Sequence, residues 1–199
     1  MGEVAALYVD ARGVYANLPD VDVWGIERDA RKYAGPWPVV AHPPCSRWCK
    51  PLALVNQTRY GHRIGDDGGC FSSALSAICA HGGVLEHPAE SYAWDRFALS
   101  KPPRRGWQYD HETKGWVCQV SQSAYGHRAR KRTWLLYVGP PPPPLRWAEP
   151  EPTATTSWLP NTTVPRQRLS KREASATPIA FRDMLLSLAR LAGEGRRVA

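Results

Sequence analysis

Short apolar runs separated by polar segments recur along the chain, and this pattern constrains the fold more than any other feature. ALYVD at residues 6–10, VVAHPPC at 39–45 and VLEHP at 84–88 each pass from apolar residues into charged residues, histidine or cysteine. Apolar runs of this length are typical of strands buried on both faces of a sheet. Further strands are expected at the start of 22–35, where a short helix follows, and within 116–126 and 133–139.

One segment has helical periodicity instead. CFSSALSAICAHGG at 70–83 places Phe71, Leu75, Ile78 and Cys79 on one helix face, and Gly82 is a typical residue for the C-terminal end. Strands that alternate with a helix predict an α/β fold built on a single Rossmann-like sheet. In such folds the loops at the strand ends carry the function.

The last third of the chain divides into a linker and a helix. GPPPPPLRWAEPEP at 139–152 is rich in proline, which favours an extended, semi-rigid chain. TPIAFRDMLLSLARLA at 177–192 predicts a helix with Thr177 as N-cap and Pro178 at its first position. We therefore expect a catalytic domain at 1–139, a proline-rich linker at 140–167 and, at 168–199, a C-terminal helix that packs back on the domain.

The chain is basic, with a formal net charge of +8 and a pI near 9.5. Between Lys101 and Arg132, eight lysines and arginines stand against two acidic residues. Aromatic side chains interleave this stretch, which is a common footprint of a polyanion partner, most often nucleic acid. We expect a nucleic acid as the partner, with a solvated basic surface that binds nothing as the alternative. The sequence does not indicate the oligomeric state.

Cysteine usage and hydropathy bear on the compartment. The five cysteines are an odd number at irregular spacing, which favours free thiols in a reducing environment. The chain lacks the run of about 18 apolar residues that a membrane-spanning helix needs, and no signal-peptide pattern follows Met1. We expect a cytoplasmic protein that makes no membrane contact.

Cys45 follows two prolines, where the backbone cannot easily rearrange. Such a cysteine can be a buried strand end, a metal ligand or a nucleophile. A zinc site would use His42, Cys45 and Cys49 with His62 or Cys70. That spacing matches no compact zinc pattern. HPAE at 87–90 is similar to the His-x-Glu element of zinc deaminases, but it stands after the Pro-Cys pair rather than before it. We therefore predict no metal.

Glu86 and a row of arginines are the other candidates for chemistry. Glu86 emerges from a buried strand, so we expect burial to raise its pKa and make it a proton donor near neutral pH. A surface glutamate is the alternative. Arg128, Arg130 and Arg132 would share one face of an extended segment beside Tyr125, which suits a base carbonyl or a phosphate. A basic loop that grips nothing is the alternative there.

Together these segments resemble a known family. HPPC, DDGGCF, VLEHP and YGHRARKRTWLLYVG are similar, in this order, to the catalytic blocks of DNA (cytosine-5) methyltransferases. Those blocks are a Pro-Pro-Cys loop, a loop before a helix, a Glu-Asn-Val strand end and a Tyr-Gly…Arg-x-Arg strand entry. The resemblance covers roughly residues 39–139, with a fainter likeness at 168–192. It implies a methyltransferase-type sheet and a transferase that acts on DNA.

The resemblance also implies roles for single residues. Cys45 would attack C6 of a flipped-out pyrimidine, and Glu86 would hold the ring N3 and the exocyclic amine. Arg130 and Arg132 would hold the O2 carbonyl, with Arg128 and Arg130 as the competing register. Further substrate contacts are expected from Ser46, His87, Tyr125 and Arg128.

The sequence departs from the family in its cofactor half. The family binds S-adenosylmethionine through a glycine-rich turn after its first strand, and here DARGVYANLPD at 10–20 contains no Gly-x-Gly. Asp10 and Glu27 remain as candidate cofactor-binding residues, so S-adenosylmethionine is possible without its usual motif. Ser46 replaces the usual Gln, and His87 replaces the Asn of Glu-Asn-Val. We expect a compact member with a truncated N-terminal half and no clear target-recognition domain.

Three functions follow as hypotheses. The first is an enzyme that transfers a methyl or other one-carbon group to C5 of cytosine in DNA through Cys45. The second is a degenerate relative that binds DNA without turnover. The third is an enzyme that acts on free nucleotides or modified bases with the same Cys, Glu and Arg site.

Overall fold

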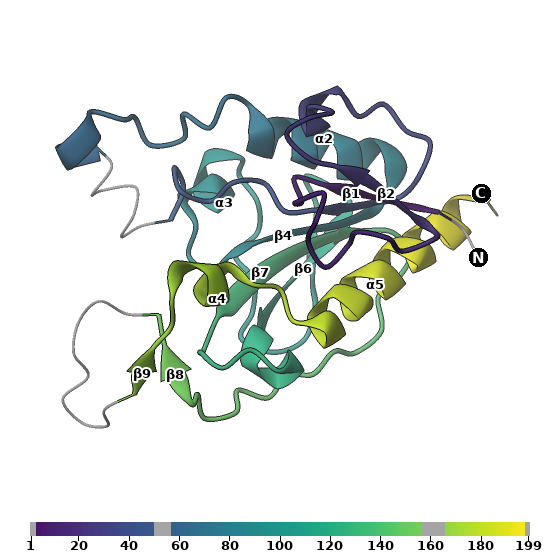
Figure 1. Cartoon of the computed structure of the whole chain (residues 1–199). Coiled ribbons are helices and arrows are strands. Elements are labelled where there is room, and N and C mark those ends of the chain that lie inside the picture. Colours follow the sequence, from purple (N-terminus) through teal and green to yellow (C-terminus); the bar gives the residue numbers. More distant parts are fainter. Residues whose placement is uncertain (1–2, 50–56, 157–165, 198–199) are drawn as a thin grey trace.

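A seven-stranded sheet forms the centre of the computed structural model, which describes residues 3–49, 57–156 and 166–197 (Figure 1). The strands lie in the order β2-β1-β3-β4-β7-β6-β5. Their bounds are β1 (Val4–Leu7), β2 (Val21–Trp24), β3 (Val39–Ala41), β4 (Gly83–Pro88), β5 (Gln108–Asp110), β6 (Gly115–Ser121) and β7 (Arg132–Val138). The first four run parallel, β7 is antiparallel to both β4 and β6, and β5 is antiparallel to β6.

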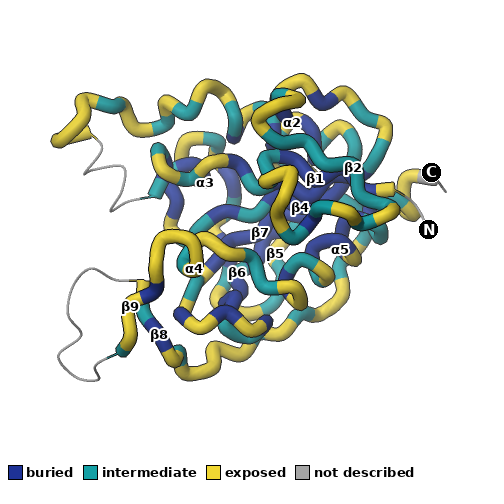
Figure 2. Tube along the Cα trace, in the orientation of Figure 1, coloured by how far each residue is buried: buried dark blue, intermediate teal, exposed yellow. Residues whose placement is uncertain are grey.

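Side chains alternate between two cores, one on each face of the sheet. Leu7, Val39 and Leu85 face one core, whereas Ala6, Val40 and Val84 face the other. Because successive side chains of a strand point to opposite faces, strands buried on both sides read as continuous apolar runs. Figure 2 shows this burial along the central strands. The expectation of strands buried on both faces is confirmed for β3 and β4, whereas β1 occupies Val4–Leu7 and begins two residues before the start of the predicted run at 6–10.

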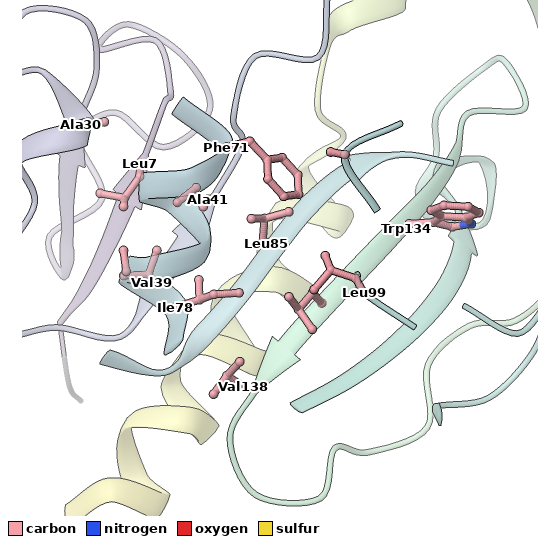
Figure 3. Packing of buried hydrophobic residues seen from close by; sticks show 14 of the residues in the cluster. Leu7, Ala30, Val39, Ala41, Phe71, Ile78, Leu85, Leu99, Trp134 and Val138 are labelled. Atoms are coloured by element: carbon pink, nitrogen blue, oxygen red, sulfur yellow. The ribbon is translucent and has the colours of Figure 1, made fainter. Parts of the chain in front are cut away.

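Two long helices cover the two faces. Helix α2 (Cys70–His81) places Phe71 and Ile78 against Leu85 and Val138, as Figure 3 shows. Helix α5 (Ile179–Arg197) lies on the opposite face. It buries six side chains there: Phe181, Leu185, Leu186, Leu188, Ala189 and Ala192. At about 25 cal/mol per Å² of apolar surface, buried side chains of this size anchor the helix firmly.

The turn from α2 into β4 depends on glycine. Gly82 caps the helix with φ 76°, as its position in the sequence predicts. Gly83 has φ 125°, and a Cβ there would lie 2.0 Å from the Val39 carbonyl oxygen. Only glycine therefore lets β4 begin beside β3, and this pairing positions the site described below.

The remaining elements are short. They are η1 (Ala30–Lys32), α3 (Tyr92–Arg96), η2 (Gln122–Tyr125), α4 (Lys171–Ser175) and the pair β8 (Ala154–Thr155) and β9 (Gln167–Arg168). The short helix predicted within 22–35 is only the three-residue η1. Residues 8–20 join β1 to β2 without a helix. Helix α5 begins at Ile179, one residue later than the predicted cap implied.

The proline-rich segment lies on the body of the protein. Residues 139–153 form no helix or strand. The indole Nε1 of Trp107 donates to the Pro143 carbonyl at 2.8 Å, and the Arg146 amide donates to the Tyr125 hydroxyl at 3.1 Å. Trp147 packs against the α5-side core. Part of the predicted linker, 157–165, lies outside the described residues. No helix in the described part of the chain is long and apolar enough to cross a membrane.

Candidate active site

Strands β3 and β4 end side by side, and the site begins there. Ala41 pairs with Leu85 in the parallel register, so the next residues, His42 and Glu86, are neighbours. After His42 the two prolines lead to Cys45, whose carbonyl accepts from the amides of Trp48 and Cys49, both at 2.9 Å. This turn brings Cys49 back over Cys45, since residues four apart share a helical face.

The two thiols interact directly. A hydrogen bond from Cys49 lowers the pKa of Cys45, with burial and Glu86 opposing it and Lys131 assisting. The same hydrogen bond and burial raise the pKa of Cys49. These opposite shifts in pKa are what a hydrogen bond from the Cys49 thiol to the Cys45 thiolate produces. Cys45 is therefore the more nucleophilic of the pair, because the thiolate is the reactive form.

Glu86 is held by two donors inside the protein. His42 Nδ1 lies 3.1 Å from Glu86 Oε2, and Gln122 Nε2 donates to Oε1 at 3.0 Å. The side chains of His42 and Glu86 are only 15% and 12% exposed. On the far side of the imidazole, Nε2 lies 2.8 Å from the hydroxyl of Tyr15. The Gln122 amide also donates to Thr133 Oγ1 at 3.0 Å.

The expected rise in the pKa of Glu86 is wrong. Burial does push its pKa upward, but the hydrogen bond and charge of His42, with the charges of Lys131 and His87, outweigh burial and lower the pKa to about 2. The prediction from sequence considered burial alone, whereas charged hydrogen-bonding partners reverse the effect of burial on the pKa. Glu86 is therefore an ionised carboxylate at neutral pH. It has no proton of its own to donate.

The structure pairs the three arginines with side chains other than Cys45 and Glu86. Arg132 makes a two-pronged contact with Glu149 at 2.9 and 3.0 Å, and Arg130 pairs with Glu151 at 3.2 Å. Arg128 donates to Gln167 at 2.8 Å. All three are exposed. That face bears carboxylates of the chain itself.

Lys131 lies on the other face of the same segment. Its charge lowers the pKa of both Cys45 and Glu86, and its Nζ donates to the carbonyls of Ser175 and Ala176 at 3.4 and 3.3 Å. Sequence analysis missed Lys131, Gln122 and Tyr15. The alternation that put the arginines on one face also put Lys131 on the opposite one. This alternation was the signal that could have identified Lys131. No sequence pattern pointed to Gln122 or Tyr15.

The three other residues predicted to contact the substrate, Ser46, His87 and Tyr125, lie in three different environments. Ser46 is exposed at the turn beside Cys45. His87 is buried between the rings of Phe71 and Trp94, and burial lowers its pKa to about 4. Its position after Glu86 in β4 turns it to the α2 side. Tyr125 is buried with its ring 5.4 Å from Phe181. Neither aromatic ring meets Glu86.

A cleft of about 1060 Å³ opens beside this site, at the ends of β1 and β2. Asp10 and Glu27, the two predicted cofactor residues, both line it, and so does Pro44 of the HPPC turn. Its size reaches the upper end of small-molecule sites, roughly 300–1,000 Å³. Two lining residues, Tyr8 and Asp29, have φ of 60° and 53°, a strained conformation that clusters at functional sites.

The cleft fits a nucleoside-sized cofactor without a glycine-rich turn. At Gly25, which lines it, a Cβ would lie 2.7 Å from the Val9 carbonyl oxygen, so the wall is built by close backbone contact. The carboxylates of Asp10 and Glu27 can accept hydrogen bonds from sugar hydroxyls or an amine.

Metal ligands do not gather in the described residues 3–49, 57–156 and 166–197. His42, which a zinc site would use, has both ring nitrogens within hydrogen-bond distance of Tyr15 and Glu86 instead. No model of a known protein family and no curated protein matches the chain.

Proposed function

We propose that this protein modifies C5 of a flipped-out pyrimidine, cytosine, in DNA, with Cys45 as the nucleophile and a methyl or other one-carbon group as the cargo. One observation carries the proposal. A cysteine with a lowered pKa and an ionised glutamate stand at the ends of adjacent parallel strands, beside a cofactor-sized cleft. The DNA (cytosine-5) methyltransferase-like order of HPPC and VLEHP supports the same chemistry.

The residues divide the work by their chemistry. Cys45 forms a bond to C6 as a thiolate, which Cys49 and Lys131 stabilise. Glu86 accepts a hydrogen bond from the exocyclic amine and contacts the ring N3, which orients the base. Asp10 and Glu27 hold the donor in the cleft, and S-adenosylmethionine would supply the one-carbon group when bound.

A free pyrimidine nucleotide is the second candidate substrate. The arginines expected to grip DNA are already paired with Glu149, Glu151 and Gln167 of the chain itself. A small substrate would not need them. A DNA substrate must compete with those contacts, and phosphate binding of that kind is steeply salt-dependent.

Covalent trapping tests the proposal. The protein is incubated with duplexes that carry 5-fluorocytosine flanked by randomised bases, with and without S-adenosylmethionine, and weighed intact by mass spectrometry. We expect an adduct on Cys45 that gains a methyl group when the donor is present. Cys45→Ser should form none and keep the circular dichroism spectrum, while Cys79→Ser serves as the matched control.

The other outcomes identify the competing functions. An adduct with 5-fluorodeoxycytidine monophosphate but with no duplex would favour the nucleotide enzyme. An adduct that needs another donor would keep the nucleophile and replace the cofactor. Salt-dependent DNA binding without any adduct would favour the binding module.

A further inference from the structure

Three segments far apart in the sequence converge on one imidazole. Tyr15 comes from the loop after β1, His42 follows β3, and Glu86 belongs to β4. The Tyr15 hydroxyl, the two ring nitrogens and the Glu86 carboxylate form a continuous line, with 2.8 Å and 3.1 Å between polar atoms. Tyr15 is 2% exposed, so the line runs from the protein interior to the site.

The direction of the hydrogen bonds follows from the charge of Glu86. An ionised carboxylate only accepts hydrogen bonds, so His42 Nδ1 carries a proton and donates it to Oε2. The amide of Gln122 donates to Oε1 but cannot release a proton. Among the described residues that hydrogen-bond to Glu86, His42 is therefore the one that can transfer a proton.

We propose that His42 supplies, through Glu86, the proton that the pyrimidine ring takes up when Cys45 adds to it, and that Tyr15 holds the imidazole in position. This role rests on the proposed function. It makes His42 and Tyr15 positioning residues that act through Glu86. It also explains how a carboxylate that is ionised at rest can serve a step that needs an acid.

Addition of Cys45 to the ring moves an electron pair toward N3. The Cys45 thiolate forms a bond to C6, the C5=C6 pair becomes a C4=C5 bond, and the C4=N3 pair moves to N3. His42 enters the step with a proton on both ring nitrogens; its Nδ1 proton passes to Glu86 Oε2 and from there to N3. The adduct is then a neutral enamine, Glu86 is again a carboxylate, and His42 is a neutral imidazole whose remaining proton is on Nε2, toward the Tyr15 hydroxyl. When Cys45 leaves, the proton returns along the same path.

Other charged groups face this line and would modulate it. Around Glu86 they are Cys45 and Cys49 on the HPPC turn, Lys131 before β7 and His87 in β4. Around Tyr15 they are Arg182 and Asp183 of α5. Of these, Lys131 favours the ionised form of both Cys45 and Glu86. It therefore keeps Glu86 without a proton at rest, so the proton for N3 must come from another group.

The test is the pH profile of adduct formation with the 5-fluorocytosine duplexes. His42→Asn keeps an N–H donor near the place of Nδ1 but cannot carry the proton. Tyr15→Phe removes the hydroxyl and retains the ring. His111→Asn is the matched control, because His111 is exposed and its ring meets that of Tyr109 edge to face.

We expect a bell-shaped profile for the wild-type protein, which rises as Cys45 ionises and falls where no acid remains to protonate N3. His42→Asn should react about 100-fold more slowly, the usual size of a general-acid contribution, and should lose the falling limb. Tyr15→Phe should shift the falling limb and react a few-fold more slowly. His111→Asn should match the wild type.

The outcomes separate this role from the proposed function. A wild-type protein that forms no adduct would overturn both. If the wild type reacts and His42→Asn keeps the falling limb, whatever the rate of its reaction, His42 only supports the structure. The proton-transfer role is then wrong. Loss of that limb in His42→Asn but not in His111→Asn would establish the role.

Discussion

The segment at 128–133 has two faces that carry similar charges in different surroundings. On one face, Lys131 and Thr133 adjoin Glu86, Gln122 and the HPPC turn, where side chains are mostly shielded from water. On the other, Arg130 and Arg132 meet Glu149 and Glu151 with side chains that are 32–78% exposed. One face is a small buried network, and the other is a set of surface ion pairs.

The difference lies in how much solvent weakens each contact. An exposed ion pair gains about 0–1 kcal/mol because water and salt screen it. A buried charge must be satisfied by its neighbours, and removing one of them leaves it unpaired at a cost of several kcal/mol. Three arginines dominate the sequence of this segment, yet one lysine on the other face acts on Cys45 and Glu86.

The largest expected effect is on stability in acid. The folded-state pKa of Glu86 is about 2, against an ordinary value of 4.5, so ionised Glu86 stabilises the fold above pH 4.5 and loses that contribution as the pH falls toward 2. The contribution is about 3 kcal/mol. Urea unfolding should show Glu86→Gln less stable than wild type at pH 7, with the gap narrowing at pH 3. A gap that stays constant with pH, or an equal one for the exposed control Glu112→Gln, would contradict this.

Next comes the reactivity of Cys45. Removing the thiol donor in Cys49→Ala should raise the pKa of Cys45 and slow its alkylation at neutral pH. One hydrogen bond is worth about 1 kcal/mol, which corresponds to about a fivefold slower reaction. Iodoacetamide labelling followed by peptide mass spectrometry measures this, with Cys79→Ala as the control. Unchanged kinetics would mean that the two thiols do not interact in solution.

A smaller effect is expected when the two faces of 128–133 are compared by the alkylation rate of Cys45. Lys131→Met should slow alkylation of Cys45 two- to threefold, an order-of-magnitude estimate for a nearby partly screened charge, whereas Arg130→Met and Arg132→Met should not. The same three variants can be tested for adduct formation with 5-fluorocytosine duplexes. If the arginine variants lose more adduct than Lys131→Met, the arginines hold the base as the family resemblance implies, and they must leave their carboxylate partners to do so.

The smallest effect belongs to the surface pairs. Glu149→Gln breaks the contact with Arg132 and should cost less than about 1 kcal/mol of unfolding free energy. The loss should vanish in 0.5 M salt, where the screening length is only a few ångströms. Urea unfolding at low and high salt measures it. A larger, salt-independent loss would show that this face is as tightly coupled as the other.

Much of the fold could be predicted because its signals are local. The run 70–83 shows its helix through apolar spacing and Gly82, and helix α2 occupies Cys70–His81. Apolar runs also locate β3, β4 and β7. Weak or very short elements, such as β5 and the β8–β9 pair, have no such pattern, because they depend on pairing partners elsewhere in the chain.

The site could be predicted only in part. Cys45 was singled out because it follows the apolar run of β3 and two prolines, and Glu86 because it comes at the end of the apolar run in β4. Asp10 and Glu27 follow β1 and β2. His42 was considered only as a metal ligand. Its partnership with Glu86 links residues 44 positions apart and depends on the parallel register of β3 and β4.

The sequence by itself therefore determined the segments that form the central strands and the two long helices, and it placed reactive side chains near the ends of those strands, because both follow from spacing along the chain. Only the tertiary structure decided which face of 128–133 meets Cys45, and that Glu86 is ionised. Alternation makes two faces but does not say which one is covered, and a pKa depends on the partners that packing supplies.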